Sequence, residues 1–70
     1  MNKDQLIVLE HLKKKRVRMT GLLTMIKFSD DHFSSNLPEE VKRAYKRLDE
    51  KQDFEILQAF AEWGLRKEDD

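Results

Sequence analysis

The sequence contains no cysteine, so it can form neither disulfide bonds nor thiolate metal sites. Its two histidines, His11 and His32, are too few for a structural zinc site, which takes four protein ligands. We expect His32, which follows two aspartates, to be a surface histidine, and we predict no metal. A chain of 70 residues without such cross-links has marginal stability. Efficient helix packing or self-association must therefore supply the stability, which makes a homodimer a serious expectation.

Glycine and proline are also scarce, with two and one residues respectively. Neither glycine belongs to a phosphate-binding loop, and we find no HExxH motif, nucleophile elbow or other arrangement of converging catalytic groups. We therefore predict that the chain is not an enzyme and uses no cofactor. No apolar run approaches the roughly 20 residues of a membrane span, and residues 6–9 are too short for the core of a signal peptide. These absences predict a cytoplasmic protein with no membrane partner.

Apolar residues recur at steps of three and four between residues 3 and 28, which is typical of an α-helix. Asn2 and Gln5 have the spacing of a capping box at the start of this helix. Thr20 and Gly21 could break it, or the glycine could let another helix approach closely. We favour an unbroken helix over about 3–28, because the apolar series continues beyond the glycine. The series consists of Leu9, Leu12, Met19, Leu23 and Ile26.

The remaining chain predicts a connector and one or two further helices. Turn-forming residues dominate 29–37, where we expect Phe33 to fill the edge of the core. Pro38 suits the first position of a helix. A single helix over 38–66 fits the apolar spacing, but we favour a turn near 50–53, with Asp49 and Gln52, or Asp53 alone, capping the last helix.

The predicted fold is therefore all-α: a small bundle of two long or three shorter helices at about 3–28, 38–49 and 53–66. We expect residues 1–70 to form a single domain with an antiparallel hairpin core completed by dimerisation, and the acidic tail, 67–70, to be frayed.

The formal net charge of zero conceals a split between the two parts of the chain. Residues 1–28 carry a net charge of +5, and residues 29–70 carry −5. An antiparallel hairpin would place the basic run 13–18 opposite Asp49 and Glu50, so that the chain neutralises itself. Arg16 interrupts the apolar series. We expect its stem to pack and its guanidinium to reach solvent or Asp49, although it could instead set the register of a helix–helix interface.

Two functions remain after these exclusions. The last helix has more apolar and aromatic surface than a fold of this size can bury, which predicts a small regulatory protein that binds another protein, or itself. The alternative is a regulator that binds DNA or RNA through the basic run of the first helix. The predicted protein-binding residues are Phe54, Ile56, Phe60 and Trp63. The predicted electrostatic or nucleic-acid contacts are Lys13, Lys14, Lys15, Arg16 and Arg18.

Overall fold

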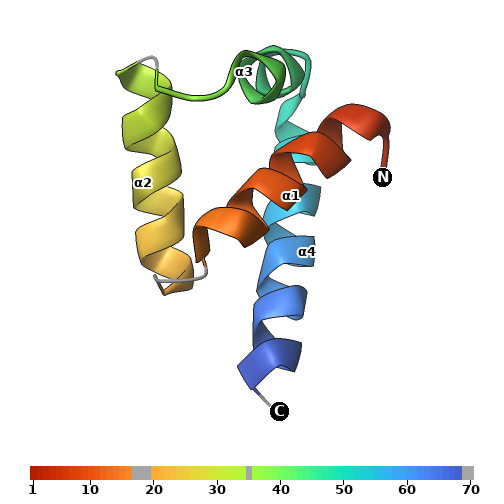
Figure 1. Ribbon diagram of the computed structural model, residues 1–70. Helices are drawn as coiled ribbons and strands as arrows, with labels where there is room; N and C mark the ends of the chain where they lie inside the picture. Colours follow the sequence, from red (N-terminus) through yellow and green to blue (C-terminus); the bar gives the residue numbers. More distant parts are fainter. Residues whose placement is uncertain (17–19, 35, 69–70) are drawn as a thin grey trace.

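The computed structural model describes residues 1–16, 20–34 and 36–68, with only the backbone described for the last two. The described residues form four α-helices and no strand. These are α1 (Lys3–Arg16), α2 (Gly21–Phe33), α3 (Glu39–Lys46) and α4 (Glu50–Glu68), arranged as a compact bundle (Figure 1). The predicted all-α class is confirmed. Residues 69–70 of the predicted frayed tail lie outside the described residues.

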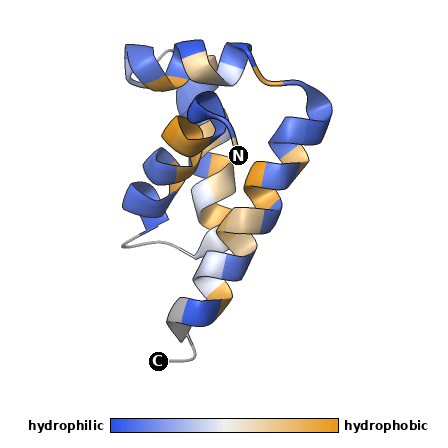
Figure 2. Ribbon diagram, turned by 90° about the vertical axis from the view of Figure 1, so that its right-hand side faces the viewer, coloured by the Kyte–Doolittle hydropathy of each residue, from blue (hydrophilic) through white to orange (hydrophobic). Residues whose placement is uncertain are grey.

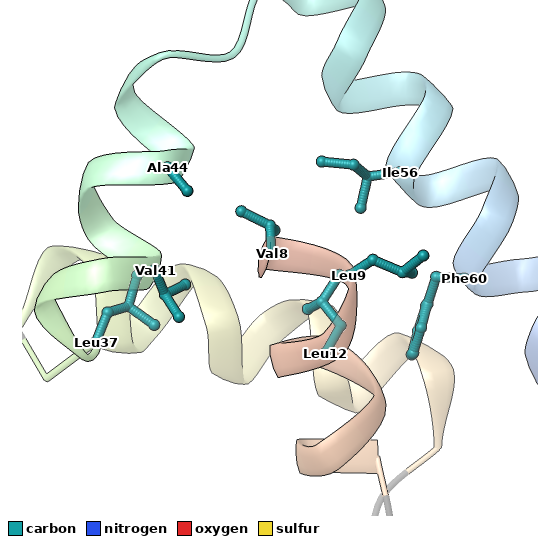
Figure 3. Close-up of a cluster of buried hydrophobic side chains, with 8 residues drawn as sticks. All are labelled: Val8, Leu9, Leu12, Leu37, Val41, Ala44, Ile56 and Phe60. Carbon is teal, nitrogen blue, oxygen red and sulfur yellow. The ribbon is translucent and has the colours of Figure 1, made fainter. Parts of the chain in front are cut away.

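Helix α1 is the centre of the bundle, because it packs against α2, α3 and α4 (Figure 1). Hydrophobic and hydrophilic residues alternate along the helices, as expected when each helix has an apolar side (Figure 2). The core side chains of α1 meet those of α3 and the residue before it on one side, and those of α4 on the other (Figure 3). The core consists of Val8, Leu9, Leu12, Leu37, Val41, Ala44, Ile56 and Phe60.

Two capping boxes begin α1 and α4, both at predicted positions. The backbone N–H of Asn2 donates to Gln5 Oε1 at 2.9 Å, and that of Gln5 donates to Asn2 Oδ1 at 2.8 Å. The same exchange joins Asp49 and Gln52 at 3.1 and 2.8 Å. Each box satisfies backbone donors that the first turn of a helix leaves unpaired. The favoured division of 38–66 into two helices is confirmed, although the turn spans 47–49 rather than 50–53.

The predicted unbroken helix over 3–28 is wrong. Thr20 has extended backbone angles, φ −70° and ψ 166°, and its Oγ1 accepts the backbone N–H of Leu23 at 3.3 Å as the N-cap of α2. The apolar spacing crosses this point, but the capping threonine starts a new helix. Gly21 then begins α2 close to α4, since a Cβ there would lie 3.9 Å from the Phe60 ring. Residues 17–19 lie outside the described residues.

The connector is shorter than predicted, and Phe33 does not fill the core. Helix α2 continues through the turn-forming residues to Phe33, helped by an ion pair of 3.1 Å between Lys27 and Asp31 one turn apart. Phe33 is exposed at the end of α2, and Leu37 takes the buried position instead. Pro38 is the N-cap of α3, which begins at Glu39.

The antiparallel hairpin is also wrong, because α1 and α4 run in the same general direction. Gln5, near the start of α1, bonds to the backbone oxygen of Gln52 in the first turn of α4. Arg16, at the end of α1, lies beside Trp63 and Gly64 in the later turns of α4. The basic end of α1 is therefore at the far end of α4 from Asp49.

Candidate interaction surface

The four predicted binding residues on α4 do not share one exposed face. Ile56 and Phe60 belong to the core of a single chain. Trp63 is half-buried and stacks on Phe60, with ring centroids 5.8 Å apart. Only Phe54 is exposed. The apolar excess of α4 is thus absorbed largely within the chain, by packing against α1.

The basic run is divided between two environments. Lys13 Nζ lies 3.6 Å from Glu10 Oε1 and 5.6 Å from the centroid of the Trp63 ring. The Arg16 guanidinium lies 5.4 Å from the same ring, so its cationic head packs on an aromatic face rather than reaching Asp49. The side chains of Lys14 and Lys15 are exposed. Arg18 lies outside the described residues.

A chain of aromatic rings attaches α2 to α1 and α3. Edge-to-face contacts join His11 to Phe28, Phe28 to Tyr45, and Tyr45 to His32, with centroids 5.9, 5.4 and 5.0 Å apart. His11 Nε2 and His32 Nδ1 are buried without a hydrogen-bond partner. Burial lowers the pKa of His11 below its ordinary value of 6.5, and Lys15 and Lys14 lower it further, while Asp31 opposes them. His11 is thus held as a neutral ring between α1 and α2.

Acidic pH is expected to lower the free energy of unfolding through protonation of His11. A histidine whose pKa is lowered by folding binds more protons in the unfolded chain, so its contribution to stability is complete above pH 6.5 and is lost as the pH falls towards the folded pKa. The free energy of unfolding, measured by urea titration, should decrease from pH 7.5 to pH 5.5. The His11→Phe variant should show a smaller decrease. An equal decrease in both proteins would show that His11 is not responsible.

An apolar groove of about 420 Å³ lies between α2 and α4. Its floor includes Met25, Leu57 and Phe60, while the exposed Leu22 and Leu65 stand at its edges. Two glycines, one on each helix, widen the groove because they have no side chain. The lining is completed by Arg16, Gly21, Ala61 and Gly64.

Sequence reasoning placed Leu22, Leu23 and Ile26 of α2, of which Leu22 lines the groove, on the apolar face of the first predicted helix. Leu22, Leu23 and Ile26 continue the apolar spacing of α1, and residues of one helix at that spacing share one face. The cap at Thr20 separates the two series, so the α2 residues do not have to face the same way as those of α1. A threonine followed by glycine was the signal that could have revealed the separation.

A second hollow, of about 750 Å³, lies between α1 and the start of α3. Charged residues of both signs surround it, with Lys14 and Lys15 on one element and Glu40 on another.

No group of three or more histidine, aspartate or glutamate side chains that could hold a metal occurs among the described residues. No helix in the described part of the chain is long and apolar enough to span a membrane. We take the apolar groove between α2 and α4 as the candidate interaction surface.

Comparisons of the chain with family models, curated proteins and solved structures found no match. The candidate function accordingly rests on the surfaces described above.

Proposed function

We propose that the chain is a small non-enzymatic regulatory protein that binds another protein, or a second copy of itself, through apolar surface on α2 and α4. The observation that supports this proposal is the groove between these helices, together with the exposed leucines at its edges. Soluble proteins seldom leave adjoining large apolar side chains in water unless a partner covers them.

The shape of the apolar surface favours a macromolecular partner over a small ligand. A small molecule resting on Phe60 and Met25 would leave the outer sides of Leu22 and Leu65 in water. An amphipathic helix of another protein would fill the groove and cover both edges, because its apolar face is a continuous stripe. The binding residues of this proposal are Leu22, Met25, Leu57 and Leu65, with Phe60 and Trp63 supporting them from beneath and beside the groove.

The nucleic-acid alternative has less support. Of the described basic run, Lys13 and Arg16 contact Trp63, so the exposed Lys14 and Lys15 remain as the main phosphate contacts. The overall charge is zero, which gives little general attraction to a polyanion. Within the proposal the protein acts in the cytoplasm, which the complete lack of cysteine supports.

A lysine at the edge of the groove should weaken partner binding. A protein retained from cell extract by the wild-type chain would be identified by mass spectrometry, and its Kd measured with purified components. Leu65→Lys is expected to weaken this Kd by at least about tenfold, because a buried leucine contact is replaced by a charge.

Phe54→Lys is the matched control, since Phe54 has similar exposure on the same helix but lies outside the groove. It should leave the Kd unchanged. Equal effects of the two variants would contradict the proposal. Retention on immobilised DNA that is lost in Lys14→Glu plus Lys15→Glu, with no dependence on Leu65, would instead support the nucleic-acid function.

A further inference from the structure

Helix α2 has large apolar side chains on two sides: Met25 and Phe28 pack against the core, but four others face away from it. The two buried residues of α2, Thr24 and Asp31, are both polar. Leu22 and Phe33 are 81% and 83% exposed, and Leu23 and Ile26 are also exposed. An amphipathic helix that packs only on its own chain presents a polar face to solvent. The exposed residues therefore indicate a second packing surface.

The four exposed residues form one stripe. At about 100° per residue, they fall within an arc of about 100°, opposite the buried Thr24 and Asp31. We refer to Leu22, Leu23, Ile26 and Phe33 as the α2 outer face. The stripe extends along nearly all of this 13-residue helix, which is about 20 Å long. This narrow apolar strip is the kind of surface that packs against another helix.

The total surface of the chain is also larger than its mass predicts. The accessible area is 5234 Å² for 8.4 kDa, whereas a folded monomer of this mass is expected to expose about 4,600 Å². The excess of about 600 Å² approaches the roughly 800 Å² that each partner buries in an ordinary stable interface. A symmetric pairing of two chains would bury an accessible area of this size on each of them.

We propose, on the basis of the function proposed above, that a second copy of the chain covers the α2 outer face, with the two α2 helices antiparallel about a two-fold axis. In this arrangement Phe33 of each copy packs on Leu22 and Leu23 of the other, and the two Ile26 side chains lie near the axis. The large residues thus stand at both ends of the stripe, as a self-complementary interface requires.

Charge also favours a second copy in this orientation. Asp30 lies within the arc of the stripe, between Ile26 and Phe33, and Lys27 lies just beside it, so antiparallel pairing brings the lysine of one copy within reach of the aspartate of the other. Parallel pairing would instead bring the two Asp30 carboxylates face to face. Two copies of a chain with zero net charge do not repel one another overall. Leu22 belongs to both surfaces, so the second copy covers that edge of the groove. Leu57, Phe60 and Leu65 on α4 remain available to a separate partner.

Sedimentation equilibrium from about 1 µM to about 1 mM tests the pairing, because self-association depends on concentration. The wild-type chain should be a dimer. Ile26→Lys plus Phe33→Lys should raise the dimer Kd at least about 100-fold, with helical circular dichroism retained because both side chains are exposed. Phe54→Lys, the matched exposed aromatic, should leave the Kd unchanged. A monomer throughout, or a dimer indifferent to Ile26 and Phe33, would overturn the proposal.

Orientation can be tested by cross-linking, since the natural chain has no cysteine. With a short bismaleimide, Ile26→Cys should link to itself, and a mixture of Leu22→Cys and Phe33→Cys should form the mixed product. Phe33→Cys alone should not link. Efficient linking of Phe33→Cys to itself would show a parallel pair and refute the antiparallel geometry.

The two proposals fail separately. Leu65→Lys should lose the protein partner and keep the dimer, whereas Ile26→Lys plus Phe33→Lys should lose the dimer. A dimer without any groove-dependent partner would support the pairing of α2 and count against the groove. A groove-dependent partner bound by a strictly monomeric chain would support the groove and count against the pairing of α2.

Discussion

Truncation of Ile56 to alanine is expected to destabilise the protein by about 2–5 kcal/mol. Ile56 is 1% exposed, and its side chain points from α4 toward Val8 and Leu9 of α1 (Figure 3). The shortened side chain leaves a cavity beside Val8 and Leu9, since close-packed neighbours only partly relax into it. In a domain of this size, 1 kcal/mol corresponds to about 4–8 °C in Tm. Thermal unfolding followed by circular dichroism should therefore show a Tm lowered by at least about 8 °C.

Phe54→Ala is the control on the same helix. Phe54 is 61% exposed, so its truncation should change the free energy of unfolding by less than about 0.5 kcal/mol. The pair of variants separates core packing from exposure to solvent, since the sequence analysis assigned both Phe54 and Ile56 to partner binding. If Ile56→Ala kept the wild-type Tm and lost a binding partner, Ile56 would be an interface residue and the described core would be incorrect.

Local sequence rules located the helix starts well. Asn2 with Gln5 and Asp49 with Gln52 form the expected capping boxes, because a capping box depends on residues only three apart. The same local reasoning gave Thr20 and Gly21 as a possible break. The error lay in ranking apolar spacing above a good N-cap, as the structure starts α2 at that point.

Tertiary arrangement was less predictable. The expected hairpin would have placed the basic run opposite Asp49, yet an exposed ion pair is worth only about 0–1 kcal/mol. Burial of Leu9, Leu12 and Phe60 outweighs such pairs, since each fully buried side chain contributes about 1.5–3 kcal/mol. Apolar packing therefore determines how α1 crosses α4, and the charges take the positions that remain.

The candidate surface was only partly predictable for a related reason. Helical spacing shows which residues share a face, but not whether that face meets the same chain or a partner. Ile56 and Ile26 lie on equally regular apolar stripes, and one is buried while the other is exposed. The distinction depends on the fold of the whole chain, in which the side of α2 that carries Thr24, Phe28 and Asp31 packs inwards.

Gln5→Glu is expected to cost about 1–3 kcal/mol, although it changes only one amide to a carboxylate. Gln5 is 3% exposed, and its Nε2 donates to the Gln52 backbone oxygen at 3.2 Å and to Glu55 Oε1 at 2.8 Å. A carboxylate retains the acceptor for the Asn2 N–H but faces these two oxygens without a proton. Urea titration at pH 7 should show the loss, and the loss should diminish at acidic pH relative to wild type as the new carboxyl group becomes protonated and can donate again.

Gln52→Glu provides the matched control, because Gln52 occupies the same third position of the other capping box. Its Oε1 accepts the Asp49 N–H, which a carboxylate does equally well, and an acidic group in the first turn of α4 suits the helix dipole. This variant should lie within about 0.5 kcal/mol of wild type. Equal losses in both variants would mean that disruption of the capping box alone accounts for the destabilisation of Gln5→Glu. A loss confined to Gln5→Glu would show that its amide fixes the start of α1 against α4, the contact from which their common direction follows.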